Sequence, residues 1–405
     1  MLKGGFARQG YDWWWHSFTA QDEETGEEKP FFIEFFCCNP ELAQDEPVFG
    51  QLPENKAAGV KPSYVMVKAG CWGQDARQMH RFFPWRDVAV GEGAPFSVSA
   101  DDCFVNETEL RGSVCVTEED AEAHPEWMCQ AGSMSWDLAM EKRITFNVGY
   151  GASAPLRAAE AFEMYWHAQG MKTMFSGTVE LDGRRYTVNP DTSYGYADKN
   201  WGRDFTSPWV WLASSNLTST ITGKKLSDTV FDIGGGRPKI YGIALDKKLL
   251  GGIWYEGKPY EFNFSKPWTG SSTEFDCYET ETDIVWSVVL DTFTARLALD
   301  VCCRKDNMLF VNYEAPNGTK RHNRLWNGGN GVGILRLYEK GPKGKLTLVD
   351  EMLAENIGCE FGEYDKEESA EELGAAPSCE VREATGCAQD GREAAGKSQR
   401  LNLRR

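Results

Sequence analysis

Hydrophobic and polar residues alternate over short stretches of this chain, which predicts strands rather than long helices. Runs of β-branched and aromatic residues recur along most of its length, separated by Gly, Asn and Pro. If the segment is extended, Phe162, Met164 and Trp166 fall on one face, because successive side chains of a strand point to opposite sides. The runs are Tyr64–Lys68, Gly112–Thr117, Arg143–Val148, Phe162–Ala168, Met174–Leu181, Pro208–Ser214, Lys239–Leu245, Ile284–Leu290, Thr294–Val301, Met308–Tyr313 and Gly331–Tyr338. The pattern favours an all-β protein of antiparallel barrels or sandwiches.

Turn and helix signals complete this picture. Asn317-Gly318 and the stretch Gly341–Gly344 are typical of hairpin turns between two strands. The few short helices are expected at Glu118–Ala123 and Ala154–Ala161. Residues 366–405 are rich in Ala, Gly, Glu, Ser and Arg and almost lack aromatic residues, so we expect a flexible C-terminal tail there.

One glycine-rich segment looks like a phosphate-binding loop but lacks its context. Gly328–Gly333 leads into a strand-like run, so no helix N-terminus follows it to receive a phosphate. We interpret it as a tight turn between strands. The spacing of His and Cys residues shows no metal-binding motif.

Composition and charge exclude several classes of partner. The 405 residues carry a net charge of −18, which argues against binding to nucleic acid or to an anionic membrane surface. The hydrophobic content of 41% and charged content of 26% are typical of a globular protein. No apolar run is long enough to span a bilayer, and no secretory signal follows Met1. We therefore expect a cytoplasmic protein without an integral membrane segment.

The most informative segment is Tyr194–Phe205, which is followed by the strand-like Pro208–Leu212. An extended conformation would place four of its side chains on one face: Tyr194, Tyr196, Asp198 and Asn200. Trp209 and Trp211 would share a face a few residues later. Asp198 is therefore expected among aromatic rings.

A carboxyl group in such surroundings is suited to one kind of chemistry. Poor solvation raises the pKa of a carboxyl group and keeps it protonated near neutral pH. A neutral acid can protonate a carbon–carbon double bond, and Trp or Tyr rings stabilise the resulting carbocation by cation–π attraction. The residues alone leave a second reading open, in which Asp198 pairs with Lys199, Arg203 or a backbone turn.

The segment Tyr196–Gly202, with the Trp-x-Trp strand after it, resembles the signature of the tocopherol cyclase and carotenoid 1,2-hydratase (hydroxyneurosporene synthase) families. The family pattern is Tyr-x-(Asp/Glu)-x-Asn-Trp-Gly. Looser similarity extends over about residues 6–364. It is carried by Tyr11–His16, Phe31–Phe35, Trp166–Gly170, Phe175–Val179, Val332–Tyr338 and Gly358–Gly362.

This resemblance implies a fold and an activity. The family fold is a bilobed body of two tandem lipocalin-like antiparallel β-barrels, which we place at residues 1–168 and 169–365, before the tail 366–405. Members cyclise, hydrate or pericyclically rearrange large hydrophobic isoprenoid or polyene substrates, and they use neither a metal nor an organic cofactor. The position of Asp198 near the domain boundary favours a pocket between the barrels.

The resemblance also implies roles for individual residues. Asp198 matches the acidic position and would be the proton donor; Asn200 would orient it, and Gly202 would allow a tight turn. In the hydratases an N-terminal Trp supports the cation, and alternation puts Trp13 and Trp15 on one face and Trp14 on the other. The residues expected to bind substrate are Tyr194, Tyr196, Trp201, Trp209, Trp211, Trp13, Trp14, Trp15, Trp166 and His167.

Three functions remain open from the sequence. The first is a cofactor-independent enzyme that protonates an alkene of a prenylated or polyene substrate. The second is a non-catalytic lipocalin-like protein that binds a hydrophobic small molecule, with Asp198 in a structural role. The third is a carbohydrate-active protein that uses Trp side chains as platforms and Asp198 with Asp204 as paired carboxylates. The sequence leaves the substrate, the reaction outcome and the formation of a homodimer undecided.

Overall fold

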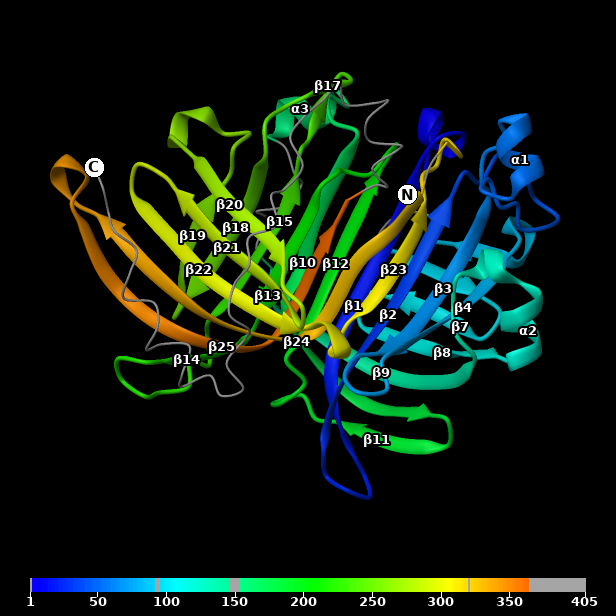
Figure 1. Cartoon of the computed structure of the whole chain (residues 1–405), viewed down its shortest axis with the longest axis horizontal. Coiled ribbons are helices and arrows are strands. Elements are labelled where there is room, and N and C mark those ends of the chain that lie inside the picture. Colours follow the sequence, from blue (N-terminus) through cyan, green and yellow to red (C-terminus); the bar gives the residue numbers. More distant parts are fainter. Residues whose placement is uncertain (1, 92–94, 146–152, 320, 364–405) are drawn as a thin grey trace.

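The structure is a computed structural model and describes residues 2–91, 95–145, 153–319 and 321–363. It consists mainly of antiparallel strands, arranged in two strongly curved sheets that lie side by side (Figure 1). The expected all-β fold of two tandem barrel-like sheets is confirmed. The expected flexible tail, residues 366–405, lies outside the described residues, as does part of the expected strand Arg143–Val148.

The first sheet has twelve strands in the order β4-β3-β2-β1-β11-β10-β9-β8-β7-β6-β5, and β12 pairs with both β1 and β10. Its strands are β1 (Tyr11–Asp22), β2 (Glu28–Cys38), β3 (Tyr64–Cys71), β4 (Arg77–Phe83), β5 (Val88–Val90), β6 (Ser97–Ala100), β7 (Cys103–Asn106), β8 (Glu109–Val116), β9 (Gly132–Ile144), β10 (Met164–Leu181), β11 (Arg184–Val188) and β12 (Gly195–Gly202).

The second sheet has eleven strands in the order β19-β18-β15-β13-β25-β24-β22-β21-β20, with β14 paired to β25 and β23 to β24. Its strands are β13 (Trp209–Ser214), β14 (Asn216–Ser219), β15 (Val230–Gly236), β18 (Lys248–Tyr255), β19 (Lys258–Phe262), β20 (Ser272–Glu279), β21 (Asp283–Asp291), β22 (Ala295–Arg304), β23 (Leu309–Glu314), β24 (Arg321–Lys340) and β25 (Leu346–Gly362). A separate hairpin is formed by β16 (Lys239–Ile240) and β17 (Ile243–Ala244).

Helices are short in the described part of the chain. The α-helices are α1 (Pro53–Ala58), α2 (Glu118–Ala123) and α3 (Ala154–Ala158). Thr117 caps α2 through a capping box with Asp120, which explains why the helix begins there. The single-turn 3-10 helices are η1 (Gly4–Ala7), η2 (Trp85–Asp87), η3 (Pro125–Trp127), η4 (Pro267–Thr269), η5 (Lys305–Asn307) and η6 (Pro342–Gly344).

Several local expectations are confirmed and others are wrong. The two hairpin signals join β23 to β24 and β24 to β25. Phe162–Ala168 and Met174–Leu181, expected as separate strands, belong mostly to one long strand, β10. Gly328–Gly333 is not a turn between strands, because it lies inside β24. A Cβ at Gly329 would lie 2.3 Å from the ring of Trp72, so this glycine lets the first sheet approach closely.

The boundary expected between residues 168 and 169 falls within β10. The chain passes from the first sheet to the second between Gly202 and Trp209. The strands β10, β11 and β12, which follow residue 168 or contain it, therefore belong to the first sheet.

Burial patterns show where the two sheets meet. In β9 only every second residue is buried, because one face meets the first core and the other meets solvent. By contrast, β3 and β13 are buried at every position. One face of each strand packs in the core of its own sheet, and the other face packs in the cluster between the two sheets.

A shared hydrophobic cluster fills the space between the sheets, and we call it the inter-sheet cluster. It contains side chains from both sheets, including Tyr11, Trp13, Trp15, Trp72, Trp166, Tyr196, Phe205, Trp209, Trp211 and Tyr313. Polar contacts also cross the boundary: the Tyr64 hydroxyl donates to Glu314, and the Gln78 amide donates to the carbonyl of Phe310, at 3.1 and 2.5 Å. The two sheets therefore form a single packed unit.

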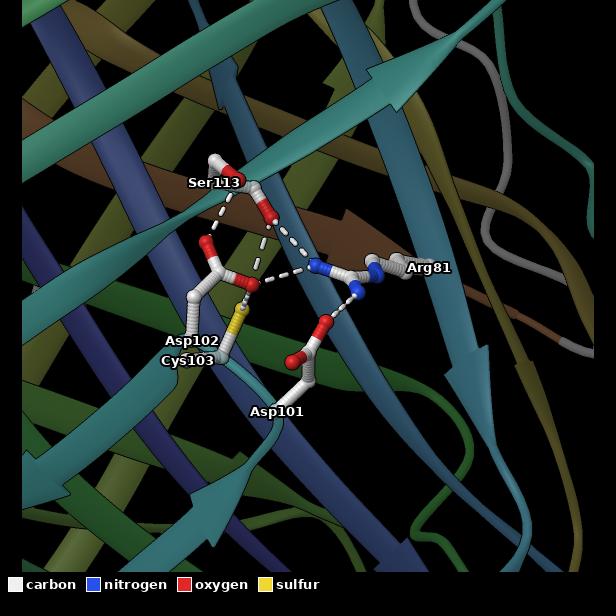
Figure 2. A network of polar contacts seen from close by, with 5 residues as sticks. All are labelled: Arg81, Asp101, Asp102, Cys103 and Ser113. Atoms are coloured by element: carbon white, nitrogen blue, oxygen red, sulfur yellow. Dashed lines mark hydrogen bonds and ion pairs between the residues drawn. The ribbon is translucent and has the colours of Figure 1, made fainter. Parts of the chain in front are cut away.

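A polar network connects β4, an edge strand of the first sheet, to the turn between β6 and β7 (Figure 2). Arg81 of β4 donates to Asp102 at 2.6 Å and also pairs with Asp101, at the turn between β6 and β7. The hydroxyl of Ser113 in β8 donates to Asp102 at 2.5 Å. The guanidinium group thus links β4 to the β6–β7 turn, with which β4 forms no strand pairing.

We expect Arg81→Ala to lower the free energy of unfolding by about 1 kcal/mol. A guanidinium group that pairs with two carboxylates stabilises the fold more than a single exposed ion pair does. Urea denaturation of the full chain measures this, and the loss should shrink at high salt. Arg86→Ala is the control, because Arg86 contacts Asp45 and Asp87 only at 3.5 and 3.6 Å and is mostly exposed. Equal effects of both variants would contradict a closing role for Arg81.

Candidate functional site

The signature segment forms β12, a strand inside the first sheet with a hydrogen-bonded neighbour on each side. Asp198 lies opposite Trp15 of β1, and Asn200 lies opposite Trp166 of β10. A strand enclosed on both sides holds its side chains in fixed directions, as a preorganised site requires. Alternation directs Tyr196 and Asp198 toward the second sheet.

The carboxyl group of Asp198 is buried, with 6% of its surface exposed. Its Oδ2 accepts hydrogen bonds from the indole N–H of Trp166 at 2.7 Å and from the hydroxyl of Tyr196 at 3.1 Å. Its Oδ1 has no hydrogen-bond partner among the described residues. Oδ2 is therefore held by two hydrogen bonds, whereas Oδ1 is held by none among the described residues.

The alternative in which Asp198 pairs with a neighbouring cation is wrong in this structure. Lys199 Nζ lies 2.7 Å from Asp12 Oδ1, and Arg203 lies 2.6 Å from Glu160 Oε2. Both cations are thus engaged with other carboxylates.

Burial raises the pKa of Asp198 to about 8. The negative charges of Glu360 and Glu34 raise this pKa further, whereas the hydrogen bonds from Trp166 and Tyr196 act in the opposite direction. Desolvation prevails, so the side chain is a neutral carboxylic acid at pH 7.

A second aspartate from the other sheet completes the surroundings of Asp198. The hydroxyl of Tyr196 also lies 3.1 Å from Oδ2 of Asp232 on β15, and Trp211 Nε1 donates to Asp232 Oδ1 at 3.2 Å. Burial is the main cause that raises the pKa of Asp232, and the charge of Asp198 adds to it. Tyr196 therefore bridges two buried carboxyl groups.

A third buried acid, Glu360 of β25, lies at the same boundary. It accepts from Trp209 Nε1 and from Asn327 Nδ2, both at 2.5 Å. Asn327 in turn accepts from Trp72 Nε1 at 2.7 Å, which extends this network to the first sheet. Burial raises the pKa of Glu360 to about 7.

An ion pair without any exposed side-chain surface lies on the first-sheet side. Lys68 Nζ is 2.8 Å from Glu34 Oε2, and the hydroxyl of Tyr313 donates to the same oxygen at 3.1 Å. Lys68 Nζ also lies 3.9 Å from the centre of the Tyr313 ring. Isolated charges at this depth are costly, so pairing and hydrogen bonding are what permit them.

Indole rings surround these polar groups. Trp15 stacks on Phe32 with 5.2 Å between ring centroids and meets Trp211 edge-on at 6.5 Å. Trp211 lies 5.0 Å from the ring of Tyr196. The site thus combines a neutral acid with several electron-rich faces.

A small apolar pocket adjoins the site, with a cavity volume of about 40 Å³. Trp166 and Trp209 form part of its wall, together with the glycines of β15 and Phe264. Each of these two indoles donates its N–H to a buried acid, Asp198 or Glu360. These two indoles therefore contact both the pocket and the buried acids.

The structure brings together only some of the residues expected to bind substrate. Trp13, Trp15, Trp166, Tyr196, Trp209 and Trp211 lie in the inter-sheet cluster. The alternation expected for the three N-terminal Trp residues is found, because Trp14 packs in the core of the first sheet.

Four expected site residues lie elsewhere. Trp14 stacks on Phe96, and Trp201 stacks on Tyr165 on the same side of β12 as Lys199. His167 alternates with Trp166 on β10 and therefore faces away from Asp198. Tyr194 precedes β12 with a positive φ of 42°, so it does not continue the face of Tyr196.

The two remaining signature residues do not act as expected. The Oδ1 of Asn200 accepts from the hydroxyl of Tyr11 at 2.9 Å, so Asn200 does not hydrogen-bond to the Asp198 carboxyl group. Gly202 makes no left-handed turn; a Cβ there would lie 2.1 Å from the carbonyl oxygen of Glu163. Close approach of β10, rather than backbone bending, explains this glycine.

The sequence analysis missed four ionisable residues of the site. Glu34, Lys68, Asp232 and Glu360 each stand alone inside an apolar run of a strand. A single charged residue between buried neighbours is a usable signal, because such a residue has to be paired or neutralised.

The class of protein follows from this arrangement: two barrel-like sheets with an uncharged acid and indole rings enclosed between them. A family model described as tocopherol cyclase-like matches residues 105–299. The resemblance inferred from the signature is thereby confirmed for the matched residues. No curated protein sequence matches the chain.

Two solved structures are similar over most of their length. Kievitone hydratase from Nectria haematococca has 12% sequence identity and a TM-score of 0.42, covering 90% of this chain and 93% of its own. CghA with Sch210972 has 11% identity and a TM-score of 0.45, covering 88% of this chain and 89% of its own.

None of the helices in the described ranges has the length and apolar character needed to cross a membrane. Within the same ranges, no group of three or more His, Cys, Asp and Glu side chains is placed to hold a metal ion.

The raised pKa of Asp198 predicts a pH-dependent stability. The unfolded carboxyl loses its proton near pH 4, whereas the folded one keeps it to about pH 8. The stabilisation is therefore fully present below pH 4 and is lost as the pH rises toward 8. We expect Asp198→Asn to gain stability relative to wild type, by up to about 1.4 kcal/mol per pH unit in this window.

Urea denaturation at pH 5, 6.5 and 8 measures this difference. The exposed carboxyl group of Asp137 serves as the control, because Asp137→Asn should leave the pH dependence unchanged. Parallel stability curves for wild type and Asp198→Asn would show that Asp198 is ionised in the folded protein.

Proposed function

We propose that this protein is a cofactor-independent enzyme in which Asp198 protonates a carbon–carbon double bond of a large hydrophobic, prenylated or polyene substrate. The outcome is cyclisation or hydration. The match of residues 105–299 to the tocopherol cyclase-like model supports the reaction class, and the geometry between the sheets supports the identity of the acid.

One observation carries this proposal: a carboxyl group with a pKa of about 8 whose Oδ1 has no hydrogen-bond partner among the described residues. A general acid works best when its pKa lies near the operating pH, because it is then protonated and still able to give up its proton. Trp166 and Tyr196 fix the other oxygen and stabilise the carboxylate that the reaction leaves.

The reaction balances without an external reagent. The O–H bond of Asp198 breaks and a C–H bond forms at one alkene carbon, which leaves a carbocation at the more substituted carbon and a carboxylate on Asp198. A hydroxyl group of the substrate or a water molecule then forms the C–O bond. The proton that this oxygen releases returns to Asp198, so the enzyme regains its starting state.

The surroundings of the acid favour the charged intermediate. The rings of Trp15 and Trp211 lie near Tyr196 and offer their faces to a developing cation. The pocket beside Trp166 and Trp209 is lined largely by apolar groups, which suits a small hydrocarbon group of the substrate. Exclusion of water from this region limits premature capture of the cation.

Turnover in heavy water tests the proposal. The full chain and Asp198→Asn would be incubated with a lipid extract of the organism that makes the protein. We expect wild type to yield a product with one carbon-bound deuterium, and Asp198→Asn to reduce its formation by at least about 100-fold. Mass spectrometry distinguishes cyclisation, which leaves the unlabelled mass unchanged, from hydration, which adds water.

Asp350→Asn is the matched control, because Asp350 is also buried and also accepts from a tyrosine hydroxyl, that of Tyr255, at 3.0 Å. It should turn over like wild type. A lipid that wild type and Asp198→Asn retain equally, without any labelled product, would contradict the enzyme and support the hydrophobic-ligand-binding protein. Cleavage of a glycan would support the carbohydrate-active alternative.

The pH profile of the same reaction gives an independent prediction. The active form of Asp198 is protonated, so kcat/KM should be constant below pH 7 and should fall about tenfold per pH unit above the pKa of about 8. Steady-state rates between pH 6 and 10 measure this limb. A rate that rises through this range would mean that the carboxylate, not the acid, is the active form.

A further inference from the structure

Four residues form a row across the face of the first sheet that packs against the second sheet. Lys68 of β3 lies directly opposite Glu34 of β2. Trp15 of β1 lies opposite both Glu34 and Asp198 of β12. Directly opposed side chains of neighbouring strands project to the same side and lie close enough to interact. The proposed acid is therefore two strands away from a second carboxyl group, with one indole ring between them.

Three consecutive members of this row each have one polar atom without a hydrogen-bond partner among the described residues. These atoms are Oε1 of Glu34, Nε1 of Trp15 and Oδ1 of Asp198. The three side chains are buried, with exposed fractions of 0, 5 and 6%. Buried polar atoms are paired in nearly all cases, so three neighbouring exceptions point to a bound polar group.

The chemistry of these atoms selects the group that fits. An indole N–H only donates a hydrogen bond, and a carboxylate oxygen only accepts one. The oxygen of a hydroxyl group or of water does both, because it accepts from Trp15 and donates to Glu34. An ether or a carbonyl group satisfies Trp15 alone, and an ammonium group satisfies Glu34 alone.

We propose, on the basis of the function proposed above, that Trp15 Nε1 and Glu34 Oε1 hold the oxygen that captures the carbocation, and that Glu34 receives its proton. Trp15 and Glu34 are then catalytic residues, because both contact the reacting oxygen. Lys68 is a positioning residue that acts through Glu34.

The ion pair with Lys68 keeps Glu34 in a state that differs from that of Asp198. Lys68 Nζ lies 2.8 Å from Glu34 Oε2, and Tyr313 donates to the same oxygen at 3.1 Å. Burial raises the pKa of Glu34, which makes its carboxylate a stronger base, whereas the charge of Lys68 acts in the opposite direction. The negative charge of Glu34 also raises the pKa of Asp198. The row thus has a neutral acid on one side of Trp15 and a base on the other.

The capture step balances with Glu34 as the proton acceptor. As the C–O bond forms, the O–H bond of the capturing oxygen breaks and a new O–H bond forms at Glu34 Oε1. Glu34 is then neutral, and Asp198 is a carboxylate. Lys68 lacks its counter-ion in this state, which favours release of the proton from Glu34. Once the product has left, the proton returns to Asp198 and the starting state is restored.

The fate of the cation tests this proposal during turnover. In heavy water, a cation that is not captured returns to an alkene that retains deuterium, so the ratio of labelled alkene to captured product measures failed capture. We expect Trp15→Phe to raise this ratio about tenfold, because Phe keeps a ring but has no N–H. Glu34→Gln combined with Lys68→Met should raise it by a similar factor, and this pair of substitutions leaves no buried charge unpaired.

The matched control is the ion pair of Asp12 and Lys199, whose Oδ1 and Nζ atoms are 2.7 Å apart. Both residues alternate with members of the inter-sheet face on β1 and β12, so they lie on the opposite face of the same sheet. Asp12→Asn combined with Lys199→Met should leave the ratio at the wild-type value. An equal rise in this control would overturn the proposal, because it would show that loss of any ion pair in the sheet has the same effect.

A measurement without substrate tests the charge of Glu34. The infrared difference between wild type and the double variant of Glu34 and Lys68 at pH 7 should contain carboxylate bands and no carbonyl band of a protonated carboxyl group. Lys68→Met alone should produce that carbonyl band, because Glu34 then loses its counter-ion. A protonated Glu34 in wild type would overturn its role as the base.

The outcomes separate the two proposals. No labelled product from wild type would contradict the proposed function. Turnover by wild type, with an unchanged ratio in Trp15→Phe and in the double variant of Glu34 and Lys68, would overturn the roles of Trp15 and Glu34 alone.

Discussion

The site between the sheets depends on one constraint: burying an ionisable group away from water costs free energy unless the group is neutral or paired. Between the two sheets, the carboxyl groups of Asp198, Asp232 and Glu360 accept hydrogen bonds from uncharged indole, hydroxyl and amide groups. Burial therefore raises all three pKa values: the uncharged form prevails at pH 7 for Asp198 and Asp232, whereas Glu360, with a pKa of about 7, is divided between the two forms. The charges of Glu34 and Lys68, by contrast, stabilise each other, because Lys68 Nζ lies 2.8 Å from Glu34 Oε2. Docking of the sheets thus creates the acid: neither barrel alone would desolvate these side chains to the same degree.

Strand alternation makes this docking possible. β12 has one face directed into the first core and the other directed toward the second sheet, so one strand supplies both packing and chemistry. The same principle explains why Trp14 and Trp201 lie away from the site although their neighbours lie within it. Close approach depends on glycine: a Cβ at Gly358 would lie 2.3 Å from the ring of Trp211, which would displace the indole that donates to Asp232.

The sequence was sufficient to predict the all-β class, the tandem barrel-like sheets and the strand that carries Asp198. It also gave the alternation of Trp13, Trp14 and Trp15, because that pattern is local. It did not give the partners of Asp198 from the second sheet, since Asp232 and Glu360 are 34 and 162 residues away in sequence and meet it only after folding. Asn200 and Gly202 were misread for the same reason: their actual neighbours, Tyr11 and Glu163, lie on other strands.

The protonation state of Asp198 at neutral pH is the central claim, and its titration tests it most directly. Carbon-13 labelling of aspartate carboxyl groups in the full chain, with Asp198→Asn for assignment, allows its NMR signal to be followed from pH 4 to 10. The account predicts a midpoint near pH 8. A midpoint near pH 4, the value of an exposed aspartate, would mean that Asp198 is a carboxylate in the folded protein and would contradict its role as the acid.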